Sequence, residues 1–582
     1  MFGIRRMLLS CGVATTLLLS LTPAFAADTV PPAKPMDPGS PDVLAVVTIP
    51  NFNSLCDHAE ALGKAFNPAA VQPGMIKGLL SQKFTEPVLA SIDGSKPITA
   101  LILPPAPGAV DGGMVDMVFF IPAKTGDALA PMVKEAKGEM AFQDGVIITS
   151  QTAAGVERGK TLLANYKKLE ADNIASDARI FVNAALVNKM FGPILQMLAA
   201  GGLEKIKKET AQAAGPFPPE MIQKLAVLYI KSALGLLNQS TAIQLDLSFD
   251  GDRIKSDTLF QAKPGSTLAG LFSAPEAYEG KTGIILAPEA AMRGFYRMNP
   301  QAISAFGEAL AAEIGADPEL KDLKESEVLE VFKKSSALMG TEGSMSIGAN
   351  KDGGMEIVQA LEVPDEAKYF AMLDEMHDLF GAEGEIGKFY AKLGMKMEMT
   401  LTKNVRQHGG VQVHASKTTI ESKLPQQQAL LNKIPTAMEI SGLKGVMITS
   451  SNPTTLDSLI DKTTAGLTVA EAALPLEAIK TFGLGQSAYF DLDFIAYMKM
   501  VSGMDPNLAM LKPVLDKLKP GAPMTFSGNY GDGRFLLKQN IPLAPLIEFT
   551  TSMQQMIQQM QPPPPPPPPP AGDGKKPVPE TF

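Results

Sequence analysis

The sequence of 582 residues contains two cysteines, four histidines and no tryptophan. Cys11 lies inside an N-terminal targeting segment, so the mature chain keeps Cys56 alone. A single cysteine excludes an intrachain disulfide and a zinc site built from several thiolates. Cys56 falls in a predicted helix over residues 52–66, where we expect a small buried apolar side chain. His58 points in another direction on that helix, so we expect no Cys–His catalytic pair.

A long apolar run occurs only at the N-terminus. Arg5 and Arg6 precede an apolar stretch over residues 8–21, and a pattern of small residues ends at Ala26, which predicts a signal peptide over residues 1–26. The short charged region favours general secretion over the twin-arginine route, which the arginine pair also resembles. No later run reaches about 18 apolar residues, so we expect no transmembrane helix in the mature chain. The expected location is the periplasm or the cell surface.

Basic residues are in the minority. The chain has 52 Lys and Arg against 61 Asp and Glu, a formal net charge of −9, and loss of the signal arginines makes it more acidic. This balance argues against nucleic acid as a partner, because affinity for phosphates comes from clustered Lys and Arg. Hydrophobic residues make up 45% of the chain, which is ordinary for a protein with large cores. The length predicts at least two domains.

Proline marks both ends of the expected globular part. A proline-rich leader covers residues 27–41, and an unbroken proline run covers residues 562–570. Such segments favour an extended conformation without internal hydrogen bonds. We therefore predict a disordered polyproline tail over residues 561–582 and a folded region over residues 42–560.

Asp-Gly pairs recur in a pattern of two short strands joined by a turn, then a proline, then an apolar helix. The four pairs begin at Asp111, Asp250, Asp352 and Asp532. Asp-Gly is a strong hairpin signal because a tight turn requires positive φ, which glycine tolerates. The proline cannot donate to a strand ladder, so it ends the pairing. The pattern predicts antiparallel hairpins that are each followed by a helix packed on the sheet.

The two halves of the chain carry these patterns in the same order. An Asp-Gly-Gly-Met turn at residues 111–114 recurs at residues 352–355, and a strand at residues 145–150 has a counterpart at residues 445–450. A co-linear series of weak matches indicates an internal duplication.

We predict an α+β fold with two duplicated halves, residues 42–275 and 276–560, each an antiparallel sheet with helices packed mainly on one face. This series of strands, helices and Asp-Gly hairpins resembles a group of uncharacterised exported bacterial proteins built from such repeats. The resemblance covers most of residues 42–560 and rests on turn and core patterns. It implies a fold and no catalytic residue.

Gly159, Lys160 and Thr161 end a segment, residues 154–161, that fits a relaxed phosphate-loop pattern between a strand and a helix. Glu157 would repel a phosphate there. The corresponding segment in the second half has no lysine. We therefore prefer an ordinary helix start, and we expect no cofactor.

Met395, Met397 and Met399 alternate along a predicted strand and so share one face, where thioethers would suit Cu(I). Core packing is the preferred interpretation, because the 31 methionines are spread through the chain. The aspartates around the Asp250 turn lack the spacing and the closing glutamate of a calcium loop. We predict no metal site.

No Gly-x-Ser-x-Gly nucleophile elbow occurs, and no pattern selects a catalytic pair among the carboxylates, so catalytic residues stay unassigned. We expect an exported, non-catalytic envelope or surface protein that acts as a binding or scaffold module toward envelope proteins or cell-wall material. One alternative is a carrier of an apolar ligand, which requires a large apolar cavity within one half. The other is a hydrolase, which requires a polar cleft with carboxylates of perturbed pKa.

Overall fold

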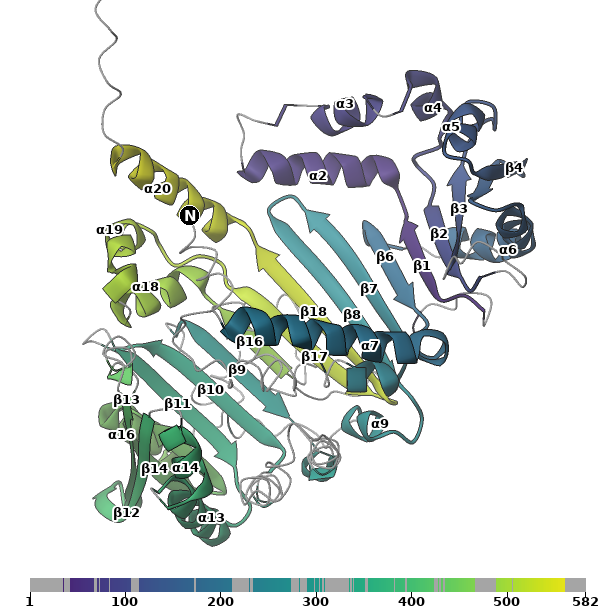
Figure 1. Cartoon of the computed structure of the whole chain (residues 1–582). Coiled ribbons are helices and arrows are strands. Elements are labelled where there is room, and N and C mark those ends of the chain that lie inside the picture. Colours follow the sequence, from purple (N-terminus) through teal and green to yellow (C-terminus); the bar gives the residue numbers. More distant parts are fainter. Residues whose placement is uncertain are drawn as a thin grey trace, which may run out of the picture.

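The computed structural model describes residues 42–105, 115–211, 234–273, 290–297, 340–465 and 488–560, with short gaps in these ranges and a few single residues between them. Figure 1 shows a broad, twisted sheet that sweeps across the molecule with helices around it. All of the described strand pairs are antiparallel, which confirms the predicted α+β class. Within the described residues, no helix is both long and apolar enough to cross a bilayer.

The first eight strands are neighbours in the order β4, β5, β3, β2, β1, β6, β7, β8. Their bounds are Ala45–Ile49 (β1), Ile98–Leu103 (β2), Asp116–Pro122 (β3), Glu139–Gln143 (β4), Val146–Ser150 (β5), Ala178–Val182 (β6), Ser240–Asp250 (β7) and Arg253–Ala262 (β8). We call these strands the first group.

The later strands continue the same sheet in the order β18, β17, β16, β9, β10, β11, β15, β14, β13, β12. Their bounds are Met292–Arg297 (β9), Glu342–Ala349 (β10), Met355–Glu362 (β11), Met395–His408 (β12), Val411–Ser422 (β13), Ala437–Leu443 (β14), Val446–Ser450 (β15), Ala488–Leu492 (β16), Met524–Gly531 (β17) and Arg534–Pro542 (β18). We call them the second group. The two groups join where β8 pairs with β18.

Both groups pair their strands in the same order. β1 lies between β2 and β6, just as β9 lies between β10 and β16, and the hairpin of β12 and β13 is an addition to the second group. Gly145 and Gly445 both have φ of 79°, so β5 and β15 start from the same kind of turn. The side chains of Asn183 and Asp493 accept hydrogen bonds from the backbone N–H groups of Leu186 (3.1 Å) and Ala496 (2.9 Å), which start the helices after β6 and β16.

Two of the four predicted Asp-Gly hairpins fall on described residues. β7 and β8 turn through Gly251 with φ of 56°, and β17 and β18 turn through Asp532 and Gly533 with φ of 51° and 70°. These left-handed angles are the reason for the glycines. The turns at Asp111 and Asp352 lie outside the described residues.

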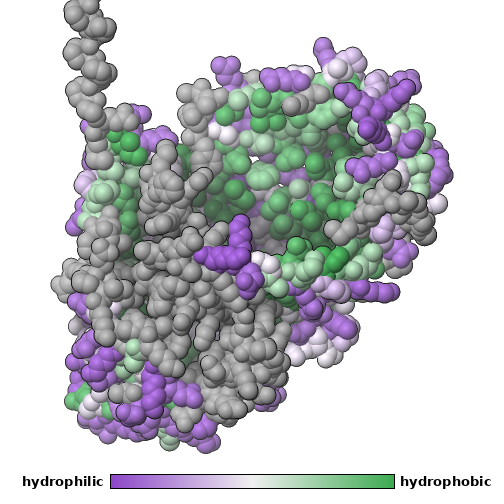
Figure 2. Space-filling view, in the orientation of Figure 1, coloured by the Kyte–Doolittle hydropathy of each residue, from purple (hydrophilic) through white to green (hydrophobic). Residues whose placement is uncertain are grey.

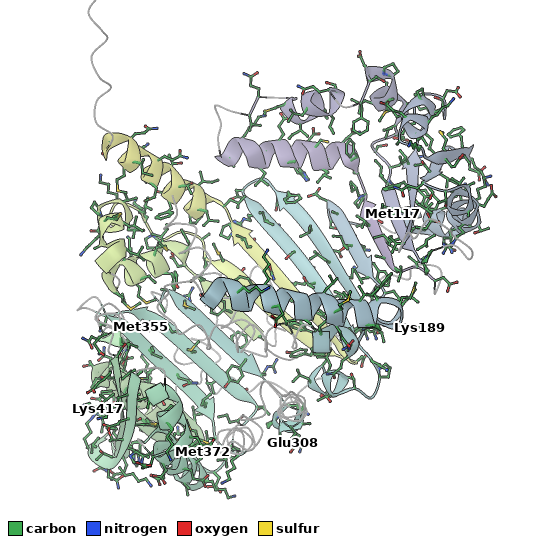
Figure 3. The ribbon with its side chains drawn as sticks, in the orientation of Figure 1. Met117, Lys189, Glu308, Met355, Met372 and Lys417 are labelled. Carbon is green, nitrogen blue, oxygen red and sulfur yellow. The ribbon has the colours of Figure 1, made fainter. Side chains whose placement is uncertain are left out.

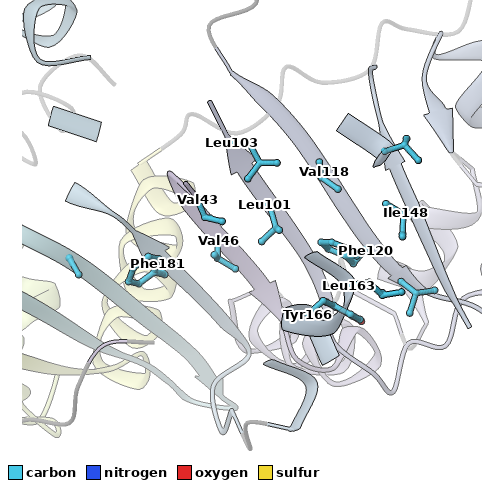
Figure 4. Packing of buried hydrophobic residues seen from close by; sticks show 13 residues of the cluster. Val43, Val46, Leu101, Leu103, Val118, Phe120, Ile148, Leu163, Tyr166 and Phe181 are labelled. Atoms are coloured by element: carbon cyan, nitrogen blue, oxygen red, sulfur yellow. The ribbon is translucent and has the colours of Figure 1, made fainter. Parts of the chain in front are cut away.

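Helices cover both faces of the outer strands of the first group. Helix α6 (Ala153–Ala171) packs on one face, where the Phe120 and Tyr166 rings stack with centroids 4.8 Å apart (Figure 4). On the opposite face, Ile147 packs with side chains of α4 (Glu86–Ser91) and α5 (Ala130–Glu135). The apolar run of β5 is buried on both sides, so one layer of helices cannot cover it.

The second group is covered in a similar way. Helix α16 (Pro453–Thr464) packs on one face of β11 and β15, and α13 (Glu366–Phe380) packs on the other. Next to them lie α14 (Glu385–Lys392), α18 (Phe494–Met504), η3 (Pro506–Leu511), α19 (Lys512–Leu515) and the C-terminal α20 (Ala544–Met560).

Candidate functional site

One face of the first group is apolar across six neighbouring strands. Alternation along each strand places this side opposite the one that packs on α6. We call it the apolar face, and its side chains are Met117, Phe119 and Ile121 on β3; Ile98, Ala100 and Ile102 on β2; Ala45, Val47 and Ile49 on β1; Ala178, Ile180 and Val182 on β6; Ile243, Leu245, Leu247 and Phe249 on β7; and Ile254, Ser256, Thr258 and Phe260 on β8.

Much of the apolar face remains open. Met117 and Phe119 are 38% and 37% exposed, whereas Phe120, the next residue on the other side of the strand, is fully buried. Ile180 and Leu245, near the middle of the face, are half-buried. Figure 2 shows hydrophobic residues gathered in a hollow at this part of the molecule, and Figure 3 labels Met117 beside it. An exposed apolar surface that spans several strands is typical of a binding site.

Helices frame the hollow. Helix α2 (Phe52–Phe66) runs along its upper border, and α7 (Ala184–Ala211) crosses in front of the sheet along its lower border (Figure 1). Half-buried apolar side chains recur along α2 at helical spacing: Phe52, Leu55, Ala59 and Leu62. The hollow therefore has an apolar floor and an amphipathic helix at its border.

Polar contacts fix α2 against the sheet and against α3 (Met75–Ser81). His58 Nδ1 lies 2.8 Å from Asp177 Oδ1, and Asp177 Oδ2 accepts a hydrogen bond from the backbone N–H of Phe249 at 2.7 Å. On the side of α3, Glu60 Oε1 accepts a bond from the N–H of Gly74 at 2.6 Å. The border of the hollow is thus held by side chains on the polar side of α2.

Cys56 is buried within this arrangement, as predicted from the helical pattern. Burial raises the pKa of its thiol, which disfavours the reactive thiolate. His58 pairs with Asp177.

The corresponding face of the second group is filled. Met292, Ile347 and Leu492 lie on β9, β10 and β16, and they are buried together with Met500 of α18. α18 follows β16 as α7 follows β6. The two groups pair their described strands in the same order, but they differ in how this face is covered. In the second group it is filled, and in the first group it is open.

The predicted phosphate-loop residues lie within a helix. Because α6 starts at Ala153, Gly159, Lys160 and Thr161 are all helical, and Lys160 Nζ pairs with Glu157 Oε1 at 2.6 Å. A Cβ on Gly159 would lie 2.5 Å from Ile148 Cγ2. Close packing of α6 on the sheet explains this glycine without a ligand.

The predicted methionine trio lies on β12, beside α13 and α14. Met397 and Met399 are half-buried and lie on the same face of β12 as Leu401, which packs against the core cluster of α13. Among the described residues, no three His, Cys, Asp or Glu side chains are placed to share a metal ion.

Two carboxylates on the face opposite to the apolar face have raised pKa values, because burial disfavours their charged forms. They are Asp257 of β8 and Asp491 of β16. Asp491 is fully buried and forms a bidentate pair with Arg293, so it has a structural partner. Asp257 faces Lys538 across the junction of the two groups.

Sequence reasoning did not identify the hollow, although part of its signal was present. Ile243, Leu245, Leu247 and Phe249 alternate with polar residues along β7, which marks an apolar face. Alternation alone does not reveal whether a helix covers such a face.

Comparisons with known proteins give no family. No family model matches the sequence, and no curated protein matches it. Among solved structures, one described as "Structure of crystal form III of TP0453" aligns with 47% of this chain and 98% of its own chain, at 10% sequence identity and a TM-score of 0.20. A similarity this low assigns neither a fold family nor a function to the protein.

Proposed function

We propose that the protein is an exported binding protein that holds an apolar ligand, such as the acyl chain of a lipid, against the apolar face. The observation that supports this most strongly is the hollow itself, in which strands β3, β2, β1, β6 and β7 carry half-buried or exposed aliphatic and aromatic side chains. Ligand sites of this kind are concave and mostly apolar.

The energetics favour a chain-like ligand. Each methylene removed from water contributes about 0.8 kcal/mol, so an acyl chain gains affinity with length until the floor is covered. The described part of the apolar face has few polar atoms, chiefly the hydroxyls of Ser256 and Thr258 on β8. The proposed site selects its ligand by apolar area and shape.

The two groups of strands support a proposal about origin as well. We infer that they arose by duplication of one α+β unit, after which the second copy filled its face with α18 and the first kept its face open. The shared pairing order and the matching turns before β5 and β15 support this inference. In this proposal the open copy carries the binding function.

A charge placed on the apolar face tests the proposal. Leu245→Asp puts a carboxylate on the floor, and an apolar ligand covering it would leave that charge without water. We expect binding of cis-parinaric acid, a fluorescent fatty acid, to weaken at least about tenfold, which corresponds to about 1.4 kcal/mol.

Ser248→Asp is the matched control. Ser248 lies on the same strand but on the opposite face, and it is also half-buried. This variant should bind the probe like the unaltered protein, with the same circular dichroism spectrum. Equal affinities for all three proteins would contradict the proposal, as would failure of the unaltered protein to bind the probe.

A further inference from the structure

Helices α7 and α18 start from equivalent places in the two groups of strands. Just before α7, the backbone N–H of Asn183 donates to the carbonyl oxygen of Leu44 at 2.8 Å. Just before α18, the backbone N–H of Asp493 donates to the carbonyl oxygen of Ala291 at 2.9 Å. Positions along the two helices therefore correspond when they are counted from Asn183 and from Asp493.

From this equivalent start, the two helices lie over different strands. α18 lies against β10, whereas α7 lies mainly against β7. In the shared pairing order, β10 corresponds to β2, and β7 corresponds to β17. α7 is therefore displaced toward β7 and away from β1 and β2, and this displacement leaves the apolar face open there.

Helix α18 shows how a helix in the other position closes the face. Met500 of α18 is 3% exposed and packs with Met292 of β9, Ile347 of β10 and Leu492 of β16. Ile357 of β11 packs at the edge of the same cluster. A helix over β10 thus removes apolar side chains of four strands from water.

Helix α7 carries a suitable side chain for the same arrangement. Met190 has the same place on α7 as Met500 has on α18. The strand register puts Ala45, Ile102 and Val182 at the positions of the three strand residues that surround Met500. A helix over β1 and β2 would bury Met190 among these apolar side chains.

Few buried contacts hold α7 in its place against β7. Among the side chains described for α7, Ala184 alone is buried, and Met197 and Leu198 are 66% and 63% exposed. The side chain of Asn188 donates a hydrogen bond to the carbonyl oxygen of Leu237 at 2.6 Å, just before β7. Segments with few buried apolar contacts open at a low cost in free energy.

We propose that α7 is a lid with two positions: the open one of this structure, against β7, and a closed one over β1 and β2. Without a ligand, closure is favoured because it removes the apolar face from water. An apolar ligand occupies the same surface, so it holds α7 against β7. The competition with a ligand rests on the proposed function, whereas the two positions of α7 do not.

Distance measurements between two nitroxide labels test the lid on the full chain. The labels are attached at Gln196→Cys on α7 and Glu135→Cys on α5, both exposed positions, with Cys11→Ala and Cys56→Ala to remove the native thiols. β7 and β2 are separated by three strand spacings, so closure should shorten the distance by about 10 Å. We expect both distances without a ligand, and the longer one alone when cis-parinaric acid is bound.

Asn188→Ala is a second test, because it removes the hydrogen bond that holds α7 toward β7. This variant should contain more of the shorter distance and should bind cis-parinaric acid at least about threefold more weakly, since less of the protein is open. Lys189→Ala is the matched control. Lys189 is the next residue on α7 and is exposed (Figure 3), so its replacement should change neither the distances nor the affinity.

The possible results separate the lid from the proposed function. A single distance that is the same with and without cis-parinaric acid would overturn the lid, even in a protein that binds the acid. Two distances in a protein that does not bind the acid would support the two positions of α7 and contradict the proposed function. Unchanged distances and affinity in Asn188→Ala would count against the lid.

Discussion

Asp491→Ala should lower the free energy of unfolding by about 3–5 kcal/mol, because it removes one partner of an ion pair in which the Asp491 side chain is fully buried and the Arg293 side chain is 11% exposed. Asp491 is fully buried, and its carboxylate accepts hydrogen bonds from Arg293 Nε at 2.9 Å, Arg293 Nη2 at 2.7 Å and the Tyr489 hydroxyl at 2.6 Å. The pair joins β16 to β9. Chemical denaturation monitored by circular dichroism measures the loss.

Two further variants show whether the loss comes from breaking the ion pair of Asp491 and Arg293. Burial raises the pKa of Asp491 although Arg293 acts in the opposite direction, so desolvation is the larger effect on this carboxyl. The double variant Arg293→Met with Asp491→Leu should therefore lose much less stability than Asp491→Ala. Lys77→Ala, which breaks an exposed pair with Asp57, should cost less than about 1 kcal/mol. A loss below about 1 kcal/mol in Asp491→Ala would contradict this account.

Phe120→Ala should cost about 3–5 kcal/mol of stability, because a large cavity would form beneath α6. The Phe120 ring is fully buried and stacks on Tyr166. Phe119→Ala is the matched control, because this neighbouring side chain lies on the apolar face and is 37% exposed. Phe119→Ala should lower the free energy of unfolding clearly less than Phe120→Ala does. Its main effect should be weaker binding of the proposed apolar ligand.

This comparison also tests whether the apolar face is open. Thermal and chemical denaturation of the two variants under the same conditions gives the difference directly. Equal losses of stability would mean that Phe119 is packed as tightly as Phe120, and the first group would then have no open face.

The sequence allowed the local turns to be predicted, because turn chemistry is local. Asp250 and Asp532 do lie at hairpins, and the strands after Gly145 and Gly445 do start from equivalent turns. These features depend on the left-handed backbone that glycine allows, so a few adjacent residues specify them. The α+β class followed from the same hairpins and helices.

Which helix covers which face of the sheet could not be predicted from the sequence, because it depends on contacts between segments that are far apart in the chain. Leu245 and Asp246 already indicate an apolar and a polar face of β7, but whether α7 covers that apolar face is decided by tertiary packing. The partners of Arg293 show the same limit, since 198 positions separate it from Asp491.

Photo-crosslinking with a diazirine-labelled fatty acid tests the central claim most directly, because it reports where an apolar chain lies on the folded protein. Peptide mapping should place the crosslinks on the apolar face, on peptides that contain Val47, Phe119, Ile180 or Leu245, and an excess of unlabelled fatty acid should abolish them. Crosslinks confined to the second group, or scattered labelling that unlabelled fatty acid does not reduce, would contradict the claim that the open face of the first group is the binding site.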